Sequence, residues 1–174
     1  MEIEATDVAL LVLRGAVGAV FLAHGWNHIF GGGRIAGTGR WFESLGMRPG
    51  VVHAWLASVT EVVAGVLLLA GLLAPLAAAG VVGVMLVAWI TNHRSNGFFI
   101  FRPGEGWEYV MTLTMAGVAL GGLGGGRLSL DHVIGLDGLD GWTGLALAAG
   151  AGGGGALVLL AVAWRPGSVP TKAG

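Results

Sequence analysis

Five apolar runs of 17 to 24 residues dominate the sequence, at residues 8–30, 51–73, 75–91, 107–123 and 141–164. A helix needs about 20 mostly apolar residues to cross the hydrocarbon core of a bilayer. Only 11% of the residues are charged and the mean hydropathy is +0.79, whereas about 25% of residues are charged in an ordinary soluble domain. The sequence therefore predicts an all-α integral membrane protein, a helical bundle with five spans.

The charged residues are distributed unevenly over the connections between these spans. If the connections alternate across the membrane, one side receives seven of the nine basic residues: Arg34, Arg40, Arg48, Arg94, Arg102, Arg165 and Lys172. The other side receives Arg127 and an acidic cluster: Glu2, Glu4, Asp7, Asp131, Asp137 and Asp140. Cytoplasmic loops carry the excess of Lys and Arg. We therefore expect a multi-pass protein of the cytoplasmic membrane with its amino terminus outside and a short cytoplasmic tail.

Composition also excludes several classes of function. The formal net charge of −1 and the scattered basic residues provide no basic surface for nucleic acid. The chain has no cysteine, which excludes disulfides, cysteine-ligated iron–sulfur clusters and haem attached through C-x-x-C-H. The glycine-rich stretch 121–126 follows no strand and precedes no Gly-Lys-Ser/Thr, so we interpret it as a helix end and turn rather than a phosphate loop.

Glycine and alanine recur four residues apart within the apolar runs, which predicts closely packed helices in a compact bundle. The positions are Gly15, Ala19 and Ala23, then Gly117 and Gly121, then Gly150 and Gly154. Residues 150–155 include five glycines, so the fifth span has the weakest intrinsic helix preference of the five.

Two ionisable residues lie inside the predicted spans, where such groups are costly and mark a functional site by default. Glu61 is ten residues into the second run, about 15 Å along a helix and close to the bilayer midplane. Arg14 is six residues into the first run, about 9 Å deep by the same rise. We interpret Glu61 as a carboxylate that handles a proton or polarises a quinone. The structural alternative is an ion pair between Arg14 and Glu61 that locks two helices together.

Histidines gather toward the basic side of the predicted bundle. His24 and His28 are one helical turn apart, and chain alternation brings His93 and Glu108 to the same membrane depth. Such a set suits zinc, iron or copper, or hydrogen bonds to a quinone carbonyl, or ordinary interfacial histidines. The glutamate of an H-E-x-x-H metalloprotease motif is absent between the first two histidines.

The remaining two histidines stand apart from this group. His53 and His132 lie at the edges of predicted spans, and neither belongs to a recognisable constellation of functional residues. We therefore expect both to face the solvated interface and assign them no role in the site.

Five local patterns, in this order along the chain, resemble the DoxX family: LRGAVGAVFLAHGWNH, TGRWFESLGMRPG, Glu61 with the apolar residues after it, NGFFIFRPGEGWEYV and GGGRLSLD. The resemblance covers residues 8 to about 131. It implies a four-helix membrane core in residues 1–131, to which residues 132–174 add a fifth span and the tail.

The resemblance also implies a relation to the DoxX and DoxD membrane subunits of thiosulfate:quinone oxidoreductase. Arg14, His24, Glu61, Gly97 and Glu108 fall where the family has its characteristic polar and glycine positions. The chain departs from the family pattern in two respects. One is His28, where the family pattern leads us to expect lysine, and the other is the fifth span.

Three hypotheses of function follow. In the first, the chain is the membrane subunit of a redox complex that passes electrons from a partner subunit to a lipid quinone. Its catalytic residues are then Glu61 and Glu108, and its quinone-binding residues are Arg14, His24, His28 and His93; whether a metal is bound stays open. The second hypothesis is a non-catalytic anchor or assembly factor for a larger membrane complex. The third is a small transporter or proton pathway through Glu61, for which the sequence offers no inverted repeat.

Overall fold

The computed structural model describes residues 3–167, and all regular elements within this range are helical. The helices of the bundle are α1 (Ala5–Phe30), α3 (Gly50–Ala70), α4 (Ala74–Ala88), α5 (Glu108–Leu123) and α8 (Gly153–Ala163). Short elements extend or connect them: α2 (Arg34–Ser44), η1 (Trp89–His93), α6 (Leu130–Ile134), η2 (Asp137–Leu139), α7 (Gly141–Leu145) and η3 (Ala146–Gly152). The predicted all-α bundle is confirmed.

Four helical stretches are long and apolar enough to cross a membrane: Ala5–Phe30, Gly50–Ala70, Ala74–His93 and Gly141–Ala163. The fourth apolar run forms α5, a shorter apolar helix of 16 residues. The last stretch is one continuous helical rod made of α7, η3 and α8, in which the glycine-rich part winds as a π-helix. The chain is a multi-pass membrane protein.

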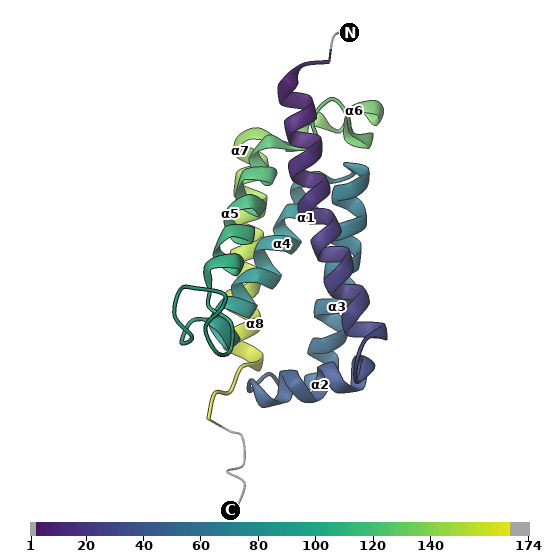
Figure 1. Cartoon of the computed structure of the whole chain (residues 1–174). Helices are drawn as coiled ribbons and strands as arrows, with labels where there is room; N and C mark the ends of the chain where they lie inside the picture. The colour runs from purple at the N-terminus through teal and green to yellow at the C-terminus, as the bar shows by residue number, and fades with distance from the viewer. Residues whose placement is uncertain (1–2, 168–174) are drawn as a thin grey trace, which may run out of the picture.

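Helices α1 and α3 lie side by side and run in opposite directions (Figure 1). They approach closely at Gly18 and Gly65, where a Cβ atom added to Gly65 would lie 2.8 Å from the carbonyl oxygen of Gly18. One helix backbone touches the other here, so neither position has room for a side chain. The same register sets Gly25 of α1 against Glu61 of α3.

Helix α4 is the centre of the other half of the bundle and packs against α5, η3 and α8. Gly117 of α5 faces Val81 and Val82, and Gly121 faces Ala148, each at a distance that leaves no room for a larger residue. These glycines therefore serve contacts within the chain.

Arg14 lies at the acidic end of the bundle and not beside Glu61. Its side chain is buried and donates hydrogen bonds to the carbonyl oxygens of Leu68 (2.7 Å), Leu69 (2.8 Å) and Leu128. The antiparallel register of α1 and α3 sets residue 14 against the end of α3, whereas Glu61 lies about two turns away. The structural alternative of an ion pair between Arg14 and Glu61 is therefore wrong.

Asp131 completes the polar contacts at this end. Its carboxylate is buried and accepts hydrogen bonds from the backbone N–H groups of Leu73 (2.7 Å) and Ala74 (2.9 Å), where α4 begins. A carboxylate is favourable at a helix N-terminus because the first N–H groups have no partner within the helix. Arg14 and Asp131 together hold the turn between α3 and α4 to the segment before α6.

Helix α2 lies across the opposite end of the bundle, below the lower ends of α1 and α3 (Figure 1). This helix is not expected from the sequence, because residues 34–44 lie between two apolar runs. Phe42 is the buried aromatic residue of α2, and Thr38 donates a hydrogen bond of 3.0 Å to the carbonyl oxygen of His28. These contacts attach α2 to the bundle, so that α2 covers this end of it.

The charges are separated between the two ends as the alternation of spans predicts. The end with α2 also receives the loop after η1 and the end of α8, and so carries Arg34, Arg40, Arg48, Arg94, Arg102 and Arg165 (Figure 1). The start of α1, α6 and η2 lie at the acidic end. Glu2 and Lys172 lie outside the described residues.

Candidate functional site

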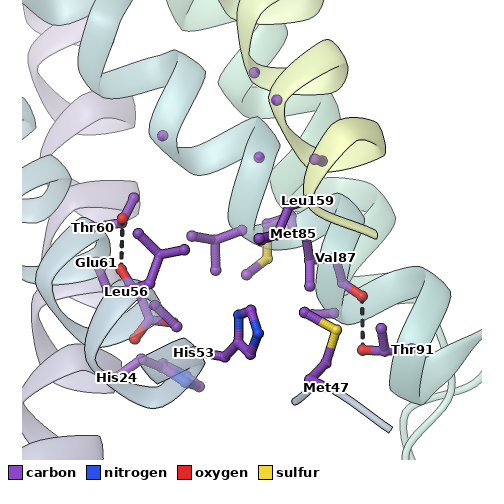
Figure 2. A pocket seen from close by; sticks show the side chains of 18 of the residues that line it. His24, Met47, His53, Leu56, Thr60, Glu61, Met85, Val87, Thr91 and Leu159 are labelled. Carbon is purple, nitrogen blue, oxygen red and sulfur yellow. Dashed lines mark hydrogen bonds between the residues drawn. The ribbon is translucent and has the colours of Figure 1, made fainter. Parts of the chain in front are cut away.

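A cavity of about 400 Å³ opens between α1, α3, α4 and α8, in the half of the bundle nearest α2. Its walls are mostly apolar and include Phe42. Met47, Leu56, Met85 and Leu159 also line it (Figure 2). Pockets of about 300–1,000 Å³ that set a few polar groups into an apolar lining are typical of small-molecule sites.

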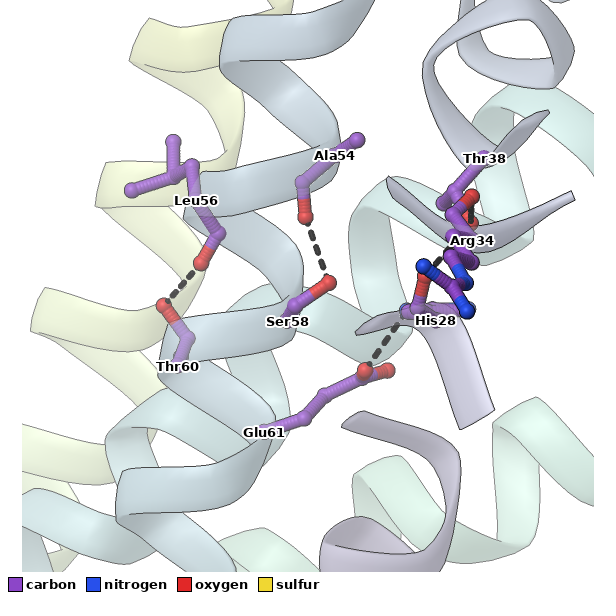
Figure 3. A network of polar contacts seen from close by, with 8 residues as sticks. All are labelled: His28, Arg34, Thr38, Ala54, Leu56, Ser58, Thr60 and Glu61. Atoms are coloured by element: carbon purple, nitrogen blue, oxygen red, sulfur yellow. Dashed lines mark hydrogen bonds and ion pairs between the residues drawn. The ribbon is translucent and has the colours of Figure 1, made fainter. Parts of the chain in front are cut away.

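Glu61 and His28 form a polar pair on one wall of this cavity. Nδ1 of His28 lies 2.9 Å from Oε2 of Glu61 (Figure 3), and the two side chains are 19% and 5% exposed. Apart from this contact, neither atom has a hydrogen-bond partner among the described residues. Gly25 makes the pair possible, because a Cβ atom there would lie 3.0 Å from that of Glu61. The position at which the chain departs from the family pattern thus provides the partner of the buried carboxylate.

His53 projects from α3 into the middle of the cavity (Figure 2). Its side chain is buried, and Nε2 lies 3.2 Å from the carbonyl oxygen of Arg48. Nδ1 is buried without a hydrogen-bond partner among the described residues. A buried polar atom left in this way costs about 1–3 kcal/mol unless a ligand or water bonds to it.

The expectation that His53 faces the solvated interface is wrong. α3 begins at Gly50 and α2 covers its first turns, so a position at the edge of an apolar run is enclosed. A signal was present in the sequence, because His53 and Glu61 are eight residues apart, a little over two turns, and so lie on the same side of one helix.

The wall contributed by η1 and α5 carries His93 and Tyr109. Nδ1 of His93 is 2.9 Å from the carbonyl oxygen of Glu105, and Nε2 is 3.1 Å from the hydroxyl of Tyr109 and 3.1 Å from the amide nitrogen of Asn92. Both ring nitrogens of this buried histidine are therefore bonded within the protein. The π-helical turn at the end of α4 carries His93, and such turns are frequent at functional sites.

The structure brings four of the six residues predicted for the site to the cavity: His24, His28, Glu61 and His93. Arg14 lies at the other end of the bundle. Glu108 does not line the cavity, because its Oε1 turns back to accept a hydrogen bond of 2.9 Å from the backbone N–H of Ile100. Glu108 thus holds the loop between η1 and α5, and its predicted convergence with the histidines is wrong.

The histidines do not form a cation site in this arrangement. Within residues 3–167, no three His, Asp or Glu side chains are placed to hold one metal ion. The arrangement instead offers hydrogen-bonding groups around an apolar space. These are the carboxylate of Glu61, the imidazoles of His28 and His53, each with one nitrogen not bonded within the described part of the protein, and the hydrogen-bonded rings of His93 and Tyr109.

Comparison with known proteins identifies the part of the chain that holds most of this cavity. The family model described as DoxX matches residues 9–94, which run from α1 to the end of η1 and include all four histidines of the cavity and Glu61. The match ends before α5, whereas the sequence resemblance was expected to continue to residue 131. Neither the comparison with curated proteins nor that with solved structures gave a match. The chain belongs to the DoxX family of membrane proteins.

Proposed function

We propose that the chain is the membrane subunit of a quinone-linked redox complex in the cytoplasmic membrane, and that its cavity holds the headgroup of a lipid quinone. The observation that carries this proposal is the cavity itself: an apolar space of about 400 Å³, within the span of the helices, with polar groups set into its walls. Small-molecule sites combine apolar walls with a few polar groups that fix the orientation of the ligand.

A lipid quinone suits this place because it resides in the bilayer and combines a flat apolar ring with two polar oxygens. The ring can pack between Leu56, Met85 and Leu159, and its oxygens can reach the polar groups of α3. Glu61 and His53 are the residues we assign to that contact, with His28 positioning the carboxylate of Glu61.

Electron transfer requires a further protein subunit. Conversion of a quinone to its quinol takes up two electrons and two protons, and a chain without cysteine carries no site for an iron–sulfur cluster or for haem attached by C-x-x-C-H. The electrons therefore come from a flavin, haem or iron–sulfur centre of a partner subunit. The basic end of the bundle, next to the cavity, is the end we assign to the cytoplasm.

The test is direct binding to the purified protein in lipid nanodiscs. Decylubiquinone and decylubiquinol are titrated separately, and binding is followed by quenching of tryptophan fluorescence, since Trp41 lines the cavity. We expect saturable binding of at least one redox form, at least ten-fold weaker in His53→Phe and in Glu61→Gln.

His132→Phe is the matched control. His132 lies in α6 at the acidic end and pairs with Asp137 at 2.9 Å, so this variant should bind as the unmodified protein does. Absence of saturable binding for both redox forms, or equal affinities in all variants, would overturn the proposal.

A second candidate function is that of an anchor or assembly factor for a larger complex. The observation that favours it is the pair Gly150 and Gly154, which are exposed on the last helical rod and have open space where a side chain would extend. Two small residues one turn apart on an outer face allow a helix of another chain to approach closely. The glycines of α5 offer no such surface, because they pack within the chain.

Replacing both glycines by leucine tests this candidate. We expect Gly150→Leu with Gly154→Leu to release the chain from its native complex on a blue native gel, while ligand binding in the cavity is retained. A complex of unchanged size in the double variant would remove the anchor hypothesis.

A further inference from the structure

The hydrogen-bond donors around the cavity are largely engaged within the protein. Thr60 donates to the carbonyl oxygen of Leu56 at 2.7 Å, and Thr91 donates to that of Val87 at 2.8 Å (Figure 2). Because these hydroxyl hydrogens point at the backbone of their own helices, neither threonine offers a donor to a ligand.

His93 and Tyr109, on the wall formed by η1 and α5, also form hydrogen bonds within the protein. A carbonyl oxygen can only accept, so Nδ1 of His93 carries the hydrogen that bonds to Glu105. In a neutral imidazole Nε2 is then an acceptor, and it faces two donors, the hydroxyl of Tyr109 and the amide of Asn92, each 3.1 Å away. The two donors share this one acceptor.

His53 presents an acceptor by the same reasoning. Nε2 faces the carbonyl oxygen of Arg48 and must donate to it, which leaves Nδ1 of the neutral ring as an acceptor. The described residues give His53 no carboxylate partner, and a buried charge without a partner is costly. Nδ1 of this cavity-lining ring is therefore available to accept from a donor of the ligand.

Glu61 adds a second acceptor. A carboxylate has no hydrogen to give, and one of its oxygens is occupied by Nδ1 of His28. The other oxygen receives no hydrogen bond from the described residues (Figure 3). His53 and Glu61, eight residues apart on α3, thus both present acceptors to the cavity.

We infer that the cavity selects the reduced, dihydroxy form of the lipid quinone over the oxidised, dicarbonyl form. This inference rests on the proposed function and specifies its ligand. The hydroxyl groups of a quinol donate to Nδ1 of His53 and to the carboxylate of Glu61, whereas the carbonyl groups of a quinone meet acceptors there. The lining side chains with N–H groups not engaged in this way, His24 and Trp41, are exposed.

The experiment compares three ligands that share one ring and one tail: decylubiquinone, decylubiquinol and the dimethyl ether of decylubiquinol. The ether keeps the shape of the quinol and lacks its two donors. Titrations use the unmodified protein in nanodiscs under anaerobic conditions, with bound ligand quantified by chromatography after separation of the nanodiscs. We expect the quinol to bind at least ten-fold more tightly than either of the other two.

The outcomes separate the two proposals. A quinone or an ether that binds as tightly as the quinol overturns the selection of the reduced form and leaves the proposed quinone site standing. Failure of all three ligands to bind saturably overturns the quinone site and the inference with it.

Two variants test whether His53 and Glu61 cause the preference for quinol over quinone. Glu61→Gln replaces a pure acceptor by an amide that also donates, so the ratio of quinol to quinone affinity should fall at least three-fold. His53→Phe removes the acceptor nitrogen and should reduce the ratio similarly, whereas His132→Phe should keep it. If both cavity variants retain thermal stability and the full ratio, the assignment to His53 and Glu61 is wrong. The ligand comparison on the unmodified protein stands whether or not a variant folds.

Discussion

At the scale of single residues, the polar groups of this bundle serve two distinct ends. Arg14 and Asp131 satisfy backbone groups near the acidic end, whereas His28, His53 and Glu61 surround a cavity near the basic end. A buried ionisable residue in a membrane helix is a functional candidate by default, yet the terminal nitrogens of Arg14 donate to backbone carbonyl oxygens of other segments. Only the three-dimensional contacts of a buried ionisable residue show whether it is structural or binds a ligand.

Replacing Arg14 by methionine is therefore expected to destabilise the fold without affecting the cavity. The change removes the charged donor from the carbonyl oxygens of Leu68, Leu69 and Leu128, and hydrogen bonds to a charged group contribute about 1.5–3 kcal/mol each. We expect a loss of about 2 kcal/mol or more in the free energy of unfolding, measured by denaturation in mixed micelles. Ligand affinity should be unchanged, and the exposed Arg102→Met should behave as the unmodified protein.

The sequence identifies polar residues in apolar runs, but it does not contain the three-dimensional contacts that decide their burial and direction. Glu61, His24, His28 and His93 could be selected because each is a polar residue in or next to an apolar run. The spacing of His53 from Glu61 indicates a shared side of one helix but not burial, because the burial of His53 depends on α2, a helix from a connection without a long apolar run. The direction of Glu108 depends on the fold of the loop around Ile100, which side-chain spacing does not describe.

At the scale of elements, the contact between α1 and α3 depends on backbone approaching backbone. Long apolar runs are sufficient to predict spanning helices, since few other structures satisfy the backbone in a bilayer. They do not determine which glycines face inward: Gly18 and Gly65 have no room for a Cβ atom, whereas Gly15 has nothing within 4 Å of one. The spacing of small residues in the sequence indicated the outward Gly15 and not the inward Gly18.

Two matched alanine substitutions test this contact. In Gly65→Ala the new methyl group would lie 2.7 Å from the backbone nitrogen of Leu22 and 2.8 Å from the oxygen of Gly18, so the helices must move apart. We expect a loss of about 1–3 kcal/mol, the usual cost of overpacking. Gly15→Ala should leave the unfolding free energy unchanged or raise it slightly; equal effects of the two changes would refute the contact.

At the scale of the whole molecule, the bundle is polarised along its axis. Basic residues gather at the end that carries α2 and the cavity, and acidic residues gather at the end that carries α6 and η2. By the positive-inside rule we expect the basic end to face the cytoplasm. The odd number of predicted spans agrees with this separation, since the start of α1 and the end of α8 lie at opposite ends.

The absence of native cysteine makes this orientation simple to measure. Ser95→Cys places one exposed thiol at the basic end and Gly138→Cys places one at the acidic end. In right-side-out membrane vesicles a membrane-impermeant maleimide should label Gly138→Cys at once and Ser95→Cys only after permeabilisation. The reverse pattern would invert the topology and assign the cavity to the outer half of the membrane.

The cavity is assembled from two parts of the chain that differ in their relation to the family. Its acceptors, His53 and Glu61, belong to the matched segment 9–94, whereas Gly152, Gly155 and Leu159 come from the last helical rod beyond it. The hydrogen-bonding groups of the cavity and part of the wall that limits its size therefore come from different parts of the chain. Larger side chains on the rod would shrink the cavity without changing His53 or Glu61, so under the proposed function different parts of the chain set the size and the redox state of the bound ring.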